Sequence, residues 1–431
     1  MLFGALLRRL IRTGTIRLID SKGREQIFGN GESPRCTLVL HSSSLENKLA
    51  FRPSLSIGEA FMEGSLTIEE GDVYDFLEII ARNLDTLETN PVFEVLGRIS
   101  HGFGAHIPRD RAQANVAHHY DLSDKLFRLF LDGDLQYSCA YFKTAEDQLE
   151  HAQLNKKRHI AAKLYLDRPR LKVLDIGSGW GGLGLYLAAE ADADVTGITL
   201  SAEQHKISNE RAEHASLKDR ARFKMLDYRE EGGHYDRIVS VGMLEHVGRR
   251  HYDDYFRKIS ELMTDSGVAL VHSIGFFDPP GPVNPFIRKY IFPAAEIPSL
   301  SEACAAVERS GLLITDVEVL RLHYADTLKA WRGKFIANWN EVAQLYDERF
   351  CRMWLFYLAL CEIGFRYRTM MVFQLQLAKR IDSLPITRDY MYEWESAHSS
   401  KPHDHAAELE SVGGYLQGVE RSNPIQQRPL W

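Results

Sequence analysis

The sequence predicts an α/β protein in which a smaller α+β N-terminal domain precedes a mostly parallel, Rossmann-like sheet with helices on both faces. Two observations predict this fold. From about residue 117, short apolar runs typical of strands alternate with longer stretches of helical periodicity. One of these runs ends in a glycine-rich loop that opens a helix. The chain has 431 residues, which is enough for two or three domains at about 150 residues per domain.

Composition excludes several classes of protein. A hydrophobic content of 45% excludes wholesale disorder, and no apolar run approaches the roughly 18 residues of a membrane-spanning helix. The net charge of −7 argues against a general nucleic-acid binder. The five cysteines are scattered, without a CxxC spacing, which fits a reducing cytoplasm better than a disulfide framework: Cys36, Cys139, Cys304, Cys351 and Cys361.

The N-terminal 25 residues are locally basic, with six Arg or Lys side chains against Asp20 and Glu25. Apolar residues between Leu2 and Ile11 recur close to helical spacing beside these cations. One interpretation is an amphipathic helix that contacts an anionic membrane surface. The other is a helix packed on its own domain, and this stretch by itself leaves both open.

Short strand-like runs separated by turns continue through the first domain, which we expect to span residues 1–110. The clearest runs are TIRLI (15–19), CTLVLH (36–41) and LAFRPS (49–54), and helical patterns follow around 57–62 and 73–80. Residues 86–115 are rich in Pro and Gly and are expected to form a linker.

The second domain is expected to span residues 111–395. Five strand-like runs make up the predicted sheet, at 171–177, 193–200, 221–227, 235–242 and 268–275. Beyond residue 300, two further strand-like runs flank helical stretches at 326–346 and 348–365, and they could add antiparallel edge strands. Residues 396–431 are hydrophilic and are predicted to be a mobile tail.

The glycine loop reads VLDIGSGWGG (173–182) and follows a strand that ends at Asp175. It lacks the GK[ST] of a P-loop, so a dinucleotide site and an S-adenosylmethionine (SAM) site are both compatible with it. A dinucleotide site expects an acid after the second strand. That strand instead offers Thr199, Ser201 and Gln204, and the third ends in Asp227 and Tyr228, which suit an adenine.

These residues belong to longer segments that resemble the cyclopropane-fatty-acyl-phospholipid synthase family, a branch of the SAM-dependent methyltransferases. The matching segments are 115–142, 173–188, 195–204, 235–248, 289–300, 323–331, 352–366 and 385–395. The first 110 residues resemble the accessory domain of the bacterial phospholipid-acting members. Two departures stand out: Ser178 replaces a family cysteine in the loop, and IFPAA (291–295) replaces IFPGG. The second departure puts chain-length or head-group preference in doubt.

The resemblance implies transfer of a methylene from SAM to the cis double bond of a phospholipid acyl chain. Methyl addition leaves a carbocation, and a base then removes a proton so that the ring closes. The pocket should therefore be apolar, with aromatic-rich segments nearby and no lysine at its centre. The resemblance further implies that a bicarbonate ion is the base, bound by Cys139, Glu245, His272, Tyr324 and the backbone of Ile274. Cys361 also matches a family cysteine, with a catalytic or a structural role equally open.

The resemblance likewise implies the cofactor-binding set, namely Tyr137, Ser138, Asp175, Gly177, Gly179, Trp180, Gly181, Thr199, Ser201, Gln204, Asp227 and Tyr228. His118 and His119 invite a metal interpretation, but no carboxylate or thiol set completes a site, so we expect no metal. Taken singly, Cys139 and His272 would more often be core residues and Glu245 a helix cap.

The expected partners are membrane phospholipid and an anionic membrane surface, with no nucleic acid. We expect a cytoplasmic protein that associates transiently with membranes, and a homodimer is plausible. Three alternatives stay open: a C-methyltransferase that makes methyl- or methylene-branched acyl chains, a small-molecule methyltransferase, and a non-catalytic lipid-binding module.

Overall fold

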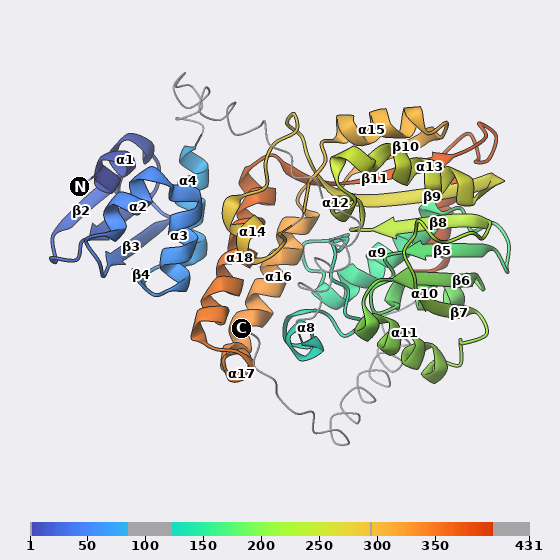
Figure 1. Ribbon diagram of the computed structural model, residues 1–431, viewed down its shortest axis with the longest axis horizontal. Helices are drawn as coiled ribbons and strands as arrows, with labels where there is room; N and C mark the ends of the chain where they lie inside the picture. The colour runs from blue at the N-terminus through green and yellow to red at the C-terminus, as the bar shows by residue number, and fades with distance from the viewer. Residues whose placement is uncertain (1, 85–122, 294, 400–431) are drawn as a thin grey trace.

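The computed structural model describes residues 2–84, 123–293 and 295–399, which form an N-terminal domain and a larger C-terminal domain (Figure 1). The predicted linker and tail, together with His118 and His119, lie largely or wholly outside these ranges. Within these ranges, no helix is both long enough and apolar enough to cross a membrane.

The N-terminal domain packs four helices against a four-stranded sheet of order β2-β1-β3-β4. Strands β1 and β3 were predicted, whereas β2 and β4 were not. In β1, Ile16 and Leu18 are buried while Arg17 between them is exposed, as expected of a strand with one covered face. Its elements are α1 (Leu2–Leu10), β1 (Thr15–Ile19), β2 (Glu25–Gly29), β3 (Arg35–Leu40), α2 (Leu45–Phe51), α3 (Pro53–Met62), β4 (Leu66–Glu70) and α4 (Val73–Asn83).

The strand predicted at 49–54 is wrong, because this stretch spans the end of α2 and the start of α3. Leu45 and Leu49 lie four residues apart on one helical face, and both are buried. Pro53 occupies the first position of α3, where its missing N–H costs no hydrogen bond.

Helix α1 resolves the two interpretations of the N-terminus in favour of a helix packed on its own domain. Phe3, Leu7 and Leu10 are buried in the hydrophobic core of that domain. Its apolar face is therefore not available for insertion into a membrane. Arg8 and Arg9 remain on the exposed side.

The C-terminal domain contains a seven-stranded sheet of order β10-β11-β9-β8-β5-β6-β7. Its strands are β5 (Lys172–Ile176), β6 (Asp194–Thr199), β7 (Ala221–Met225), β8 (Tyr235–Val241), β9 (Met263–Phe276), β10 (Leu313–Val319) and β11 (Met370–Ala378). The helices are α8 (Asp124–Phe130), α9 (Leu149–Lys163), α10 (Gly182–Glu190), α11 (Ala202–His214), α12 (Leu244–Val247), α13 (Tyr252–Leu262), α14 (Pro285–Tyr290), α15 (Leu300–Arg309), α16 (His323–Ala337), α17 (Trp339–Leu345), α18 (Glu348–Tyr367) and α19 (Asp389–Ala397), with a 3-10 turn at Arg249–His251.

All five strands predicted for the second domain between residues 171 and 275 are present and pair in parallel. Their apolar runs are continuous because both faces of the sheet are covered: Val173 packs into one core and Leu174 into another. The chain order reverses between β5 and β8, which is the place where open α/β sheets bind ligands.

Strands β10 and β11 extend the sheet beyond β9, as the two late strand-like runs suggested. Strand β11 is antiparallel to both of its neighbours. As a result β10, at the edge, runs in the same direction as β9. The sheet is therefore parallel except for β11, the one strand that runs in the opposite direction.

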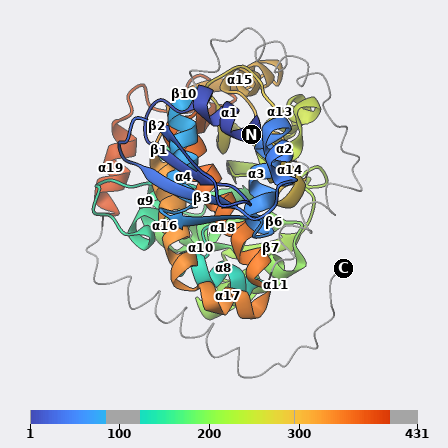
Figure 2. The same cartoon turned by 90° about the vertical axis from the view of Figure 1, so that its left-hand side faces the viewer.

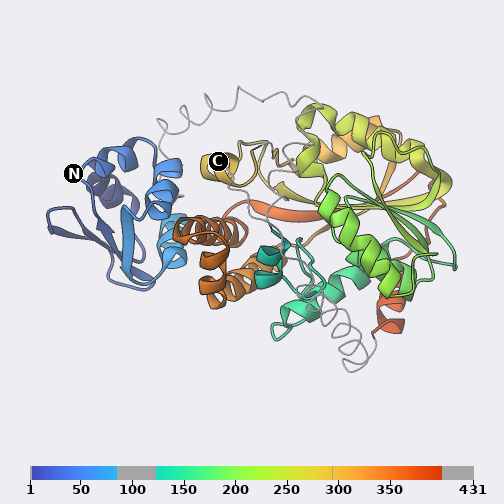
Figure 3. The same ribbon diagram turned by 60° about the horizontal axis from the view of Figure 1, so that its bottom comes forward.

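Helices α14, α16 and α18 stand between the sheet and the N-terminal domain (Figures 1 and 3). The view in Figure 2 looks onto the N-terminal domain, with these helices behind it. Polar contacts also join the two domains: the Tyr367 hydroxyl donates to Glu78 Oε1 at 2.8 Å, and Lys289 Nζ lies 2.6 Å from Glu59 Oε1.

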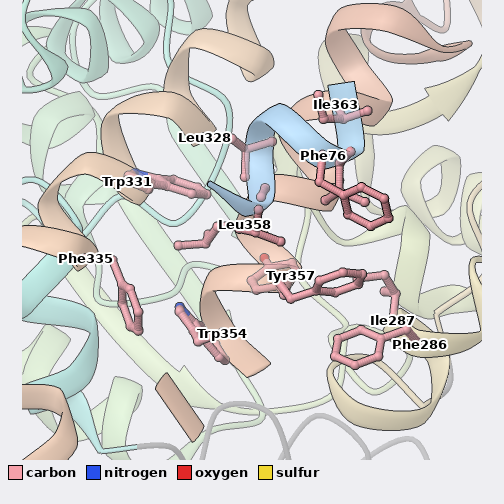
Figure 4. Packing of buried hydrophobic residues seen from close by; sticks show 14 of the residues in the cluster. Phe76, Phe286, Ile287, Leu328, Trp331, Phe335, Trp354, Tyr357, Leu358 and Ile363 are labelled. Atoms are coloured by element: carbon pink, nitrogen blue, oxygen red, sulfur yellow. The ribbon is translucent and has the colours of Figure 1, made fainter. Parts of the chain in front are cut away.

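The apolar part of this contact is tightly packed around Gly58 of α3. A Cβ atom at this position would lie 2.8 Å from the ring of Phe356 and still closer to that of Phe286. The two rings pack edge to face, with centroids 4.8 Å apart. Figure 4 shows Phe286 of α14, Tyr357 of α18 and Phe76 of α4 in the same hydrophobic cluster.

Replacement of Gly58 by alanine should lower stability, although alanine is the better helix former. We expect a loss of about 1–3 kcal/mol, because the added methyl would overpack the domain contact. The matched control is Gly333→Ala in α16, where a Cβ would meet nothing within 4 Å. That variant should gain about 0.5–1 kcal/mol. Thermal unfolding of both variants measures the difference, and equal shifts would contradict the packing argument.

Candidate active site

The glycine loop after β5 takes the backbone conformation that its sequence predicts. Gly177 and Gly179 have φ values of +80° and +55°, and Gly181 caps the N-terminus of α10 with φ +84°. The N–H groups of Gly177 and Ser178 donate to the carbonyl of Ile198, which ties the loop to β6. The loop thus turns over the carboxyl edge of the sheet with room for a ligand above it.

A first cavity of about 150 Å³ lies against this loop, and we call it the loop cavity. The predicted cofactor residues that line it are Tyr137, Ser138, Asp175, Gly177, Gly179, Trp180, Thr199, Gln204 and Tyr228. On one wall the Thr199 hydroxyl donates to Gln204 Oε1 at 2.8 Å, a buried pair that fixes both polar groups. Thr199 is the last residue of β6, Gln204 lies in α11, and Tyr228, which also lines the cavity, follows β7.

Three predicted cofactor residues lie outside the lining of the loop cavity. Gly181 shapes the turn into α10, and Ser201 caps α11 by accepting the N–H of Gln204. Asp227 forms an ion pair with Arg229, two residues further on. Gly181 and Ser201 therefore begin the helices α10 and α11, whose residues line the cavity, while the Asp227 carboxylate is paired with Arg229.

Lys156 of α9 lines the loop cavity and was not predicted. It is 2% exposed, and its ammonium donates to Gln136 Oε1 at 2.6 Å and to Ser138 Oγ at 2.9 Å. Burial lowers its pKa to about 8. Lys156 lines the loop cavity, whereas no lysine is among the described residues that line the second cavity, described next.

A larger cavity of about 740 Å³ adjoins the first, and we call it the apolar cavity. Four residues line both cavities: Tyr137, Ser138, Gly242 and His246. From there the apolar cavity extends between α14, α16 and α18 to the N-terminal domain. Leu77, Ile80 and Ala81 of α4 complete its wall.

All six residues of the predicted catalytic set line the apolar cavity, although they come from five separate parts of the chain: Cys139, Glu245, His272, Ile274, Tyr324 and Cys361. Glu245 follows β8, whereas His272 and Ile274 lie on β9. The Gly242 N–H donates to the carbonyl of His272 at 2.9 Å and holds the two strand ends together. The parallel sheet thus brings these groups to one edge.

Glu245 is bound through one oxygen and unpaired at the other. Its Oε1 accepts the backbone N–H of Ile274 at 2.6 Å, while its Oε2 is buried without a hydrogen-bond partner in the described structure. Burial raises the pKa of this carboxyl to about 7. The N–H of Ile274 is therefore committed to Glu245, and Glu245 does not orient His272.

His272 is instead held by Gln374 of β11, which was not predicted. The Gln374 amide lies 3.1 Å from Nδ1 of His272, so an amide N–H donor leaves Nε2–H as the donor of the neutral ring. Burial lowers the pKa of His272 to about 3, which keeps the ring neutral.

The remaining polar groups of the set are neutral donors. Burial raises the pKa values of Cys139 and Tyr324 above their ordinary range, and that of Cys361 to about 12. The Tyr137 and Tyr357 hydroxyls lie 2.7 Å apart, and both tyrosines line the apolar cavity. Neutral thiols argue against a cysteine nucleophile and in favour of a wall of weak donors.

The aromatic-rich segments contribute more to the core than to the cavity. Phe127, Phe130 and Trp354 are buried, and the last two pack edge to face at 5.8 Å. Tyr137 and Tyr357 from the same segments do line the apolar cavity. In the described parts of the chain, no group of three or more His, Cys, Asp or Glu side chains is arranged so that it could hold a metal ion.

Comparison with known proteins agrees with this geometry. The family model described as mycolic acid cyclopropane synthetase matches residues 108–375, and a domain of unknown function matches residues 8–91. A probable fatty acid methyltransferase of Pseudomonas putida is 36% identical over 85% of this chain and 93% of its own. The cyclopropane-fatty-acyl-phospholipid synthase of Escherichia coli K12 is 37% identical over 84% of this chain and 92% of its own.

Among solved structures, the mycolic acid cyclopropane synthase CmaA1 complexed with SAH and CTAB superposes with a TM-score of 0.59. It is 32% identical and covers 63% of this chain and 99% of its own. The family model alone matches more than half of the sequence. The chain therefore belongs to the mycolic acid cyclopropane synthetase family, within the superfamily of SAM-dependent methyltransferases.

Proposed function

We propose that this methyltransferase is a cyclopropane-fatty-acyl-phospholipid synthase, which adds a methylene to the cis double bond of an unsaturated phospholipid acyl chain. The observation that carries the proposal is the junction of the two cavities at Tyr137, Ser138, Gly242 and His246. A cofactor in the loop cavity would present its methyl group to an acyl chain in the apolar cavity. When bound, SAM supplies the electrophilic methyl.

The protein contributes mainly position and the exclusion of water, because an alkene is a weak nucleophile and the resulting cation would react with water. The apolar cavity is walled largely by aliphatic and aromatic side chains. Tyr137, Ser138 and His246 lie at the end that it shares with the loop cavity, whereas Asn284, Arg288 and Arg368 line other parts of its wall. Ionised Glu245 would stabilise positive charge on the acyl chain.

The donor set is suited to a small oxyanion such as bicarbonate. Glu245 Oε2 lacks a partner among the described residues and can accept the O–H of bicarbonate. The imidazole of His272 and the phenol of Tyr324 are neutral donors that line the same cavity, as does the Cys139 thiol, which donates to the carbonyl of Ala140 at 3.3 Å in this structure. Such an anion would supply a base for the proton lost on ring closure. Cys361, also neutral, fits a wall residue better than a nucleophile.

Glycerophospholipid as the substrate is supported by the rim of the apolar cavity. Arg288 is exposed and lines this cavity, so it lies where the cavity meets solvent. A guanidinium there suits a phosphate head group.

Since the apolar face of α1 is buried, we propose that membrane contact is electrostatic, through exposed Arg8, Arg9 and Arg12. A cytoplasmic location and a homodimer remain predictions.

A second candidate product is a methyl- or methylene-branched acyl chain, which the name of the Pseudomonas putida relative favours. The methyl-transfer step is common to both, and the two reactions differ in which proton the cation loses. A soluble small-molecule substrate is less compatible with an apolar cavity of about 740 Å³.

The product itself tests the proposal. Lipids extracted from cells that express the protein, in a host without cyclopropane lipids, should show the upfield ring-proton signals of a cyclopropane in NMR spectra. Methyl- or methylene-branched chains in their place would support the second candidate. Unmodified lipids, with SAM binding intact and good expression, would contradict both.

Replacement of Glu245 by glutamine should lower kcat by about 10²-fold or more, the range for loss of a group that stabilises charge in the transition state. SAM affinity should be unchanged, since Glu245 lines only the apolar cavity. Glu245 is ionised above a pKa of about 7, so the kcat of the wild type should rise with pH through that value. The glutamine variant should lack this rise. Turnover measured against pH checks the kcat and its pH dependence, and calorimetry checks SAM binding. A variant with the wild-type kcat and pH profile would exclude Glu245 from the catalytic set.

Replacement of Arg288 by glutamine should raise KM for vesicles of anionic unsaturated phospholipid by up to roughly fivefold, as expected for one exposed ion pair. kcat at saturating lipid should not change. Arg257→Gln, an exposed arginine on α13 outside both cavity walls, is the control. Equal changes in KM for the two variants would show that only general surface charge matters.

A further inference from the structure

The loop cavity carries two buried charged groups that the described protein does not satisfy. Lys156 has three N–H donors and two acceptors, Gln136 Oε1 and Ser138 Oγ. In the described ranges no carboxylate forms an ion pair with it. Two neighbouring carboxylates are otherwise engaged: Asp134 pairs with Lys157 and Arg211, and Asp132 accepts backbone N–H groups.

Asp175, at the end of β5, is the second group. It is 2% exposed, and its Oδ2 has no hydrogen-bond partner within the described structure. A buried charge without a partner is costly, so such groups are normally completed by a ligand or an ion. Here both groups line the same cavity, and they have opposite charge.

A wall with one unsatisfied cation and one unsatisfied anion is complementary to a zwitterion. The loop cavity is also lined by Thr199, Gln204 and Tyr228, which offer a hydroxyl, an amide and an aromatic face that suit a nucleoside. Thr199 ends β6 and Tyr228 follows β7, and these strands succeed β5 in the sheet. SAM joins a nucleoside to an α-amino acid through its sulfonium. Its amino-acid end would then lie toward Lys156, Ser138 and Asp175.

We infer that Lys156 binds the α-carboxylate of SAM, with Ser138 beside it, while Asp175, which the family resemblance already assigns to the cofactor, faces the α-ammonium. This assignment rests on the proposed use of SAM but not on the identity of the product. It also explains how the site tolerates a lysine near cationic chemistry. Lys156 lines the loop cavity and not the apolar cavity, and the cofactor carboxylate would neutralise it.

The test compares SAM with decarboxylated SAM, which keeps the sulfonium and the amine but lacks the carboxylate. Calorimetry on the full-length wild type should show that SAM binds roughly 10- to 100-fold more tightly, the range for a hydrogen bond between charged groups. In Lys156→Met this preference should fall to near one, through weaker binding of SAM. Affinity for 5′-methylthioadenosine, which lacks the amino-acid end, should be unchanged.

Lys157→Met is the matched control, because this neighbouring buried lysine pairs with Asp134 and does not line the loop cavity. It should lower the melting temperature and preserve the preference for SAM. If Lys156→Met does not fold, Lys156→Gln takes its place. A wild type that binds SAM and decarboxylated SAM equally, or a Lys156 variant that keeps the full preference, would overturn the inference. A wild type that binds none of the three ligands would instead contradict the proposed function.

Discussion

The site depends on one partly buried stretch without regular secondary structure, residues 135–142, whose residues line both cavities. Its backbone groups find partners in side chains of neighbouring helices. Gln153 of α9 donates to the carbonyls of Gln136 and Ser138, and Thr327 of α16 accepts the Ala140 N–H at 3.0 Å. A buried irregular segment persists only when such groups are satisfied. These bonds therefore fix Tyr137 and Ser138 on both cavities and Cys139 on the apolar one.

Burial around this segment sets the protonation of the site. The carboxyls of Asp175 and Glu245 have pKa values raised to about 7, and His272 is kept neutral by a pKa lowered to about 3. These shifts have one common cause, the loss of water around each group. The same loss of water would protect a carbocation from hydrolysis. Electrostatics and chemistry thus follow from one packing arrangement.

The N-terminal domain contributes to the site although it lies far from the glycine loop in sequence. Helix α4 supplies part of the wall of the apolar cavity, and the close fit of Gly58 against Phe286 and Phe356 sets the position of α3 beside it. Since packed interiors adjust little, a shift of this domain would reshape the cavity. Residues of the two domains therefore line one cavity.

The sequence by itself determined the elements whose signals are local. The five parallel strands are continuous apolar runs, and the loop glycines are needed where φ is positive, so both were readable without coordinates. The predicted residues Cys139, Glu245, His272 and Tyr324 were identified from long motifs rather than from periodicity. In contrast, strands β2 and β4 each bury a single residue, so their apolar signal is weak. The stretch 49–54 is helical because Leu45 and Leu49 pack on one face.

Only the tertiary structure decided which side chains contact each residue of the site. Lys156, Tyr357 and Gln374 stand in ordinary helices and a strand, where nothing local distinguishes them from core residues. Their roles arise from contacts that join distant parts of the chain, such as Gln374 with His272 and Tyr357 with Tyr137. The apolar face of α1 is likewise an amphipathic pattern in sequence, and its burial depends on the core that it meets. Local patterns predict elements, whereas the partners of a side chain are set by packing between elements.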